Sequence, residues 1–214
     1  MIITEIQGNH HSLAAATARL DLYFKKTWEQ YEKLDPKTDM TQSPEQMAET
    51  HDAGRQVIEA SFIFCVVAAS FIEAIANLYL ALKCGADATL FATLERTNIE
   101  DKWEALPRLF NPSYKLNFGV LPGSDFVQLI RIRNKIVHSK AFIKENETVF
   151  QKGTKVDFTA QDMAFFQRLG SLPKLLVQNL ERHDNSDAMD LLINMSGIET
   201  DWYETKRKER VKMA

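Results

Sequence analysis

Residues 61–82, SFIFCVVAASFIEAIANLYLAL, decide how the rest of the chain folds. The stretch is almost continuously apolar and is long enough to raise the question of a membrane span. Glu73 lies near its middle, where a charge in lipid costs about 2.5 to 3.5 kcal/mol, and no second span or basic flank accompanies it. We therefore interpret the stretch as the buried central helix of a soluble protein and expect no membrane partner.

Capping signals and helical periodicity extend this interpretation along the chain. Ser43 is followed by Pro44 and, three residues on, by Gln46, a capping box that begins a helix over residues 44–83, and Gly85 is suited to end it. Further helices are predicted over residues 12–33, 98–110, 125–139, 159–182 with a bend at Pro173, and 187–195. The fold class is all-α, a bundle of about five to seven helices, with a small β-hairpin or an ordered loop near residues 147–158.

Composition favours one folded domain. The chain has 214 residues, 45% of them hydrophobic, and a net charge of −3. We expect a single domain over 1–214, with a core over about 12–182 and a C-terminal extension over 183–214. Cys65 and Cys84 lie about 28 Å apart along one predicted helix and so cannot pair, and no secretory leader is recognised, which favours a cytoplasmic location.

Several common kinds of active site lack their sequence signatures. The chain contains no glycine-rich phosphate loop, no Cys/His spacing typical of zinc sites and no Gly-x-Ser-x-Gly elbow. Neither a metal nor a cofactor is therefore expected.

The helix predicted over residues 125–139 carries a charge on its apolar side. At 100° per residue, Arg133 falls near the middle of a broad face. A buried guanidinium needs a partner, and Glu73, the only acid between residues 60 and 83, is the obvious candidate. We expect the two to form an ion pair and the two helices to pack together. That apolar face consists of Phe126, Leu129, Ile130, Ile132, Ile136 and Val137.

One edge of the same helix gathers polar side chains. Asn134 and His138 are four residues apart on this edge, and Arg131 lies close by in projection. Residues 111–144 contain six basic residues against the single acid Asp125, in a chain that is acidic overall. An anionic partner is therefore favoured at this surface, where an imidazole, an amide and a guanidinium can hold a phosphate and move a proton.

The pattern of these residues resembles that of a known protein family. Arg133-Asn134-x3-His138, late in a helix of an all-α chain, resembles the Arg-x4-6-His signature of HEPN domains, in which a polar residue commonly follows the arginine. Residues 71–77, FIEAIAN, and Lys102-Trp103 at the start of the next helix are also similar to HEPN sequences, especially those of bacterial and mobile-element origin. The resemblance covers about residues 60–144.

The resemblance implies a function and roles for the residues. Many HEPN domains are metal-independent endoribonucleases of toxin-antitoxin or phage-defence systems that act as homodimers with one shared cleft. His138 would be the general acid/base, Arg133 the phosphate and transition-state stabiliser and Asn134 an orienting residue. Arg131 also satisfies the spacing, so the choice between the two arginines stays open, with Glu73 in a supporting role. RNA, a second copy of the chain and an antitoxin protein are the expected partners.

Two alternatives stay open at the level of sequence. Some HEPN domains are noncatalytic, and the chain would then be a nucleotide-binding or dimerisation module. Arg133, Glu73 and Asn134 would otherwise form a purely structural network in an unrelated helical scaffold, because buried ion pairs also produce such clusters.

Overall fold

The structure, a computed structural model, describes residues 2–34, 43–137 and 160–198, and these form helices and connecting loops with no strand among them. The all-α prediction is confirmed for this part of the chain, and the predicted hairpin near residues 147–158 lies outside it. In chain order the helices are α1 (Ile2–Leu34), α2 (Pro44–Cys84), α3 (Ala88–Leu94), α4 (Ile99–Glu104), α5 (Leu106–Phe110), α6 (Gly123–Val137), α7 (Ala160–Leu169), α8 (Leu172–Glu181) and α9 (Asp187–Ser196).

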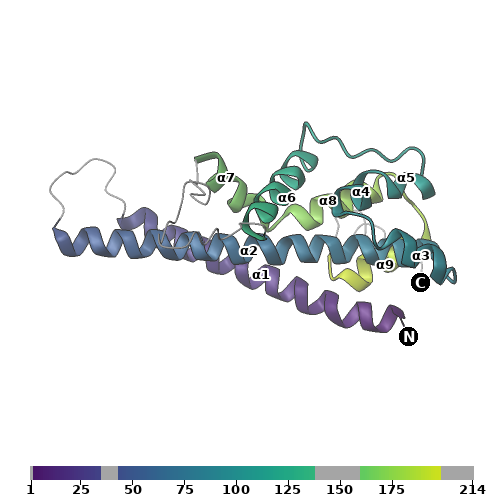
Figure 1. The fold of residues 1–214 in the computed structure, drawn as a ribbon, viewed down its shortest axis with the longest axis horizontal. Helices are drawn as coiled ribbons and strands as arrows, with labels where there is room; N and C mark the ends of the chain where they lie inside the picture. Colours follow the sequence, from purple (N-terminus) through teal and green to yellow (C-terminus); the bar gives the residue numbers. More distant parts are fainter. Residues whose placement is uncertain (1, 35–42, 138–159, 199–214) are drawn as a thin grey trace, which may run out of the picture.

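The two longest helices, α1 and α2, lie side by side in opposite directions along the length of the molecule (Figure 1). The predicted capping box begins α2: the Gln46 N–H donates to the Ser43 hydroxyl at 3.3 Å, and the Ser43 N–H donates to the Gln46 side chain at 3.0 Å. The helix ends at Gly85, whose φ of 57° is a conformation that glycine adopts without steric cost. Local signals therefore placed both ends of the central helix correctly.

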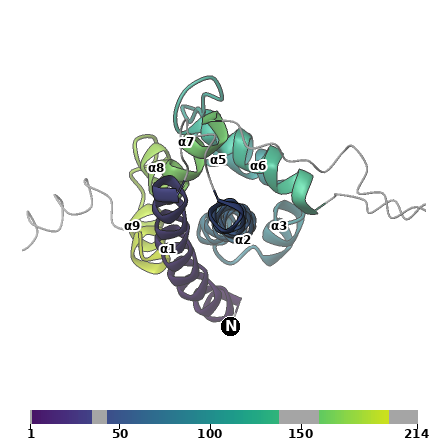
Figure 2. The ribbon, with the colours of Figure 1, turned by 90° about the vertical axis from the view of Figure 1, so that its left-hand side faces the viewer.

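The other helices cover two sides of α2. Figure 2, which looks along this helix, shows α1 and α9 on one side of it and α6 on the other. Three phenylalanines join the layers, because the Phe24 ring of α1 lies 6.2 Å from Phe64 of α2 and 5.7 Å from Phe166 of α7. All three side chains are fully buried. The core is thus built around the middle of α2.

Burial bears on the question of a membrane span. By length and composition alone α2 is able to cross a membrane, but half of its most apolar window is buried against the rest of the molecule. Phe64, Ile72 and Leu78 of α2 are fully buried in this way. The same helix also carries exposed apolar side chains, among them Ile58 and Ile63.

Two predicted helices are each divided. The helix expected over residues 98–110 is interrupted at Ala105, and Leu109 in its second part is 64% exposed. The helix expected over residues 159–182 breaks at Gly170, where a Cβ would lie 2.5 Å from the Asp21 carboxyl group of α1. Pro173 instead stands at the beginning of α8, where its missing N–H costs no hydrogen bond.

The described core also extends further toward the C-terminus than predicted. Met189, Leu192 and Ile193 of α9 are buried in the main cluster, so the core does not stop near residue 182. The short helix α3 was not predicted at all. Its Phe91 and Leu94 form a second, smaller cluster with the last turns of α2 and with α5.

Candidate functional site at the C-terminal half of α6

The position of α6 is set at its first turn. A Cβ at Gly123 would overlap the backbone carbonyl of Asn117, so only glycine allows the preceding loop to pass this close. Asp125 then accepts two hydrogen bonds from Arg168 of α7, at 3.0 Å and 2.9 Å, in a two-pronged ion pair. The single acid of α6 is therefore already neutralised.

Three contacts show how α6 runs along α2. Trp103 of α4 donates from its indole N–H to the carbonyl oxygen of Ile72 at 3.2 Å, and its ring lies 6.3 Å from Phe126 of α6. One turn further along α6, the Cys65 thiol lies 3.8 Å from the carbonyl oxygen of Leu129. Increasing residue numbers in α6 therefore match decreasing numbers in α2. The predicted packing of these two helices is confirmed.

This direction explains why the expected pair between Arg133 and Glu73 is wrong. Arg133 lies one turn beyond Leu129, and so beside the part of α2 that precedes Cys65. Glu73 lies about 12 Å from Cys65 in the opposite direction along α2, since it follows Cys65 in the chain. It pairs instead with the ammonium group of Lys102 of α4 at 2.9 Å, and the Lys102 side chain is only 2% exposed. The buried charge that Glu73 balances is a lysine that sequence reasoning had not considered for this role.

Arg133 has a different partner. Its Nη1 donates to the amide oxygen of Asn134 at 3.0 Å, and both side chains are half-buried. Within residues 2–34, 43–137 and 160–198, no carboxylate lies within ion-pair distance of the Arg133 guanidinium. Because Asn134 is neutral, the positive charge of Arg133 is oriented by this contact and is not cancelled by it.

The positive charge of Arg133 acts on the thiol of Cys65 in α2. Burial raises the pKa of the Cys65 thiol to about 12, although the nearby positive charge of Arg133 acts in the opposite direction. The thiol therefore stays protonated at neutral pH and is no nucleophile. Its role is packing, and Cys65 and Cys84 are both free thiols, in agreement with the prediction that they do not pair.

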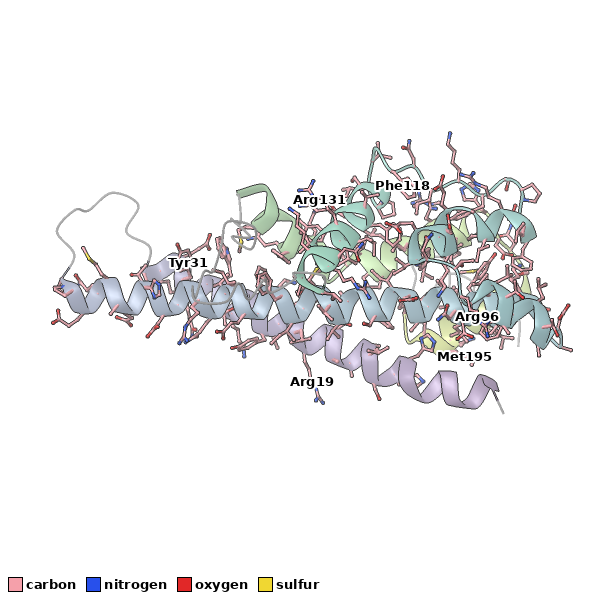
Figure 3. The ribbon with its side chains drawn as sticks, in the orientation of Figure 1. Arg19, Tyr31, Arg96, Phe118, Arg131 and Met195 are labelled. Carbon is pink, nitrogen blue, oxygen red and sulfur yellow. The ribbon has the colours of Figure 1, made fainter. Side chains whose placement is uncertain are left out.

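The two arginines of α6 face different surroundings. Arg131 is exposed and extends outward on the side of the molecule that carries α6 (Figure 3), whereas Arg133, about 200° further around the helix, is half-buried. Phe126, Leu129, Ile130 and Ile132 form the buried face as predicted, but Val137 is 49% exposed. His138 lies outside the described residues, so the described part of the site consists of Arg131, Arg133 and Asn134.

A second polar cluster was missed by sequence reasoning. Lys83 of α2 lies 2.6 Å from Asp184, which also accepts a hydrogen bond from the Tyr79 hydroxyl at 2.9 Å. Lys83 donates to Ser186 at 2.8 Å and lies 5.6 Å from the centre of the Tyr79 ring. The cluster fastens the end of α2 to the connection between α8 and α9. More than 100 residues separate its two halves, and no local signal links them.

Ionisation in this cluster follows from its contacts. Burial acts to raise the pKa of Asp184, but hydrogen bonds from Lys83, Ser186 and Tyr79 outweigh it, so the pKa lies below its ordinary value. Burial, together with the neighbouring Asp184 charge, raises the pKa of Tyr79. Asp184 is thus a buried carboxylate and Tyr79 a neutral donor to it.

Among the residues that the structure describes, no group of three or more His, Cys, Asp or Glu side chains is arranged to hold a metal ion. Comparisons with protein-family models, with curated proteins and with solved structures found no match to this chain.

Proposed function

We propose that this protein is a metal-independent endoribonuclease whose site lies at the C-terminal half of α6. The observation that carries the proposal is the positive charge of Arg133 and the neutral partner that holds it. Its guanidinium is held by the neutral amide of Asn134, and no carboxylate of the described residues neutralises it. The N–H groups that Asn134 does not use donate to no other side chain of the described residues, and they can bind phosphate oxygens in the planar geometry that arginine favours.

The proposed reaction needs one acid/base group and one cation. His138 removes the proton from a ribose 2′-hydroxyl, whose oxygen attacks the adjacent phosphorus. The bond from phosphorus to the 5′-oxygen of the next nucleotide breaks, and that oxygen takes up a proton. The products are a 2′,3′-cyclic phosphate and a 5′-hydroxyl. Arg133 stabilises the negative charge that develops on the phosphate oxygens, and Asn134 fixes its direction.

The choice of nucleic acid tests this chemistry. Purified protein is expected to cleave single-stranded RNA in the presence of EDTA and to leave DNA of the same sequence intact, because DNA lacks the 2′-hydroxyl nucleophile. Gel analysis of end-labelled oligonucleotides measures both rates, and treatment of the products with acid distinguishes a cyclic phosphate from a linear one. Cleavage of DNA at a similar rate, or complete inhibition by EDTA, would refute the proposal.

The same proposal includes a homodimer, and exposed apolar side chains on α2 support it. Ile58 is 40% and Ile63 54% exposed, and Val66 and Val67 beside them are half-buried. This part of α2 adjoins Cys65, whose thiol lies 3.8 Å from the carbonyl oxygen of Leu129 in α6. A second copy docked on these apolar side chains is the proposed dimer interface.

If the dimer forms through this surface, a charged side chain placed in it should give a monomer. Light scattering of the wild-type protein should give twice the 24.5 kDa chain mass, and Ile63→Glu should give the monomer mass, since a charge at the centre of an apolar interface is costly. Leu191→Glu is the matched control, because Leu191 is 50% exposed on α9, away from the proposed interface. A wild-type monomer at tens of micromolar, or a dimer that Ile63→Glu leaves intact, contradicts this interface.

A further inference from the structure

The exposed face of α6 carries two basic side chains one turn apart. Arg131 and Lys135 are both exposed. Residues four apart on a helix have Cβ atoms about 5 to 6 Å from each other, so the two charged groups extend from neighbouring points. Figure 3 shows Arg131 on the α6 side of the molecule and Arg19 of α1 on the opposite side.

No acid of the described residues balances these two charges. Asp125, the one acid of α6, is held by Arg168 at 2.9 Å and 3.0 Å. No carboxylate in the described part of the chain lies within ion-pair distance of Arg131 or Lys135. Other basic side chains of the described residues do have such partners, among them Lys25, Arg55, Lys83, Lys102, Arg108 and Arg168. In a chain with a net charge of −3, this is a local positive surface.

We propose that Arg131 and Lys135 bind backbone phosphates of single-stranded RNA other than the phosphate that reacts. The inference rests on the proposed function and deepens it, because it separates the roles of the two arginines. Arg131 and Arg133 extend in nearly opposite directions from α6, so they do not serve one phosphate from the same helix. Arg133 acts at the reacting phosphate, and the exposed pair holds the strand.

A structural role for the pair has a different signature. Basic residues near a helix C-terminus also interact favourably with the helix dipole, which would stabilise the fold without any ligand. Their removal would then lower the melting temperature and leave RNA affinity unchanged.

Binding is measured without cleavage by using 2′-O-methyl RNA, which has no free nucleophile. Fluorescence anisotropy with a labelled single-stranded oligonucleotide gives Kd at several salt concentrations. Arg131→Ala/Lys135→Ala should raise Kd roughly tenfold at low salt. It should also reduce the slope of log K against log salt by about 1.4, or about 0.7 for each lost phosphate contact on a single strand.

Arg19→Ala/Lys26→Ala is the matched control, since it removes two exposed charges from α1. It should change neither Kd nor the salt slope by more than the experimental error. Equal losses in both double variants, no loss in the α6 variant, or no RNA binding by the wild type would overturn the inference. Binding that depends on the α6 pair in a protein that cleaves no RNA would instead retain the inference and reject the nuclease.

Discussion

His138→Ala is expected to slow RNA cleavage by about 10² to 10⁴, the usual contribution of a positioned general acid/base. The loss should fall on kcat, because His138 is assigned to the proton transfer, whereas the exposed basic side chains Arg131 and Lys135 are assigned to binding. Single-turnover cleavage of end-labelled RNA measures it directly. His51→Ala is the matched control, since His51 is an exposed histidine of α2 outside the proposed site, and it should cleave at the wild-type rate.

A second substitution tests the charge of Arg133 in the same assay. Asn134→Asp keeps an acceptor for the Arg133 guanidinium but replaces a neutral oxygen by a carboxylate, which cancels the charge that the reaction needs. Activity should fall although the contact and the fold persist. Wild-type rates in folded His138→Ala protein would place the activity elsewhere. Wild-type rates in Asn134→Asp would show that cleavage does not need the positive charge of Arg133, on which the proposed function rests.

Local sequence signals predicted the elements well. Ser43, Pro44 and Gln46 placed the start of α2 because a capping box involves only neighbouring residues. The helix predicted from residue 98 begins at Ile99 as α4, because Asn98 is its cap and accepts a hydrogen bond from the Asp101 N–H at 2.8 Å. The helix α3 was missed because it is too short to show a helical period.

Partners across the fold were not predictable in the same way. Helical periodicity showed that Glu73 and Arg133 each occupy a partly apolar setting, but it does not say in which direction α6 crosses α2. That direction, set by Trp103 against Phe126 and Cys65 against Leu129, separates the two charges. The contact between Arg133 and Asn134 joins adjacent residues, and even so its geometry depends on what α6 packs against.

The largest expected effect on stability lies at Asp184. Its carboxylate accepts hydrogen bonds from the buried Tyr79 hydroxyl and pairs with Lys83, whose side chain is 13% exposed. Asp184→Asn keeps the shape but leaves the ammonium group of Lys83 without its counter-charge. Breaking a buried pair by removing one partner costs about 3 to 5 kcal/mol of unfolding free energy. Urea denaturation followed by circular dichroism measures the change.

A matched control and a double-mutant cycle isolate the pair. Asp187→Asn makes the same chemical change at an exposed position in the first turn of α9, and it should cost less than about 1 kcal/mol. If Lys83 and Asp184 act together, Lys83→Met should recover part of the loss caused by Asp184→Asn. Additive losses would show that the two side chains contribute separately.

The pH dependence of stability gives an independent check on the same carboxylate. The folded state lowers the pKa of Asp184 from its ordinary value of 3.8, so the folded protein binds fewer protons at this group than the unfolded chain. Its stabilisation is therefore fully present above that ordinary value and is lost as the pH falls through the lower folded pKa. The difference in unfolding free energy between wild type and Asp184→Asn should be constant from pH 7 to about pH 5 and shrink below it. A difference that instead grows on acidification would mean that Asp184 is not the carboxylate that holds Lys83 and Tyr79 in place.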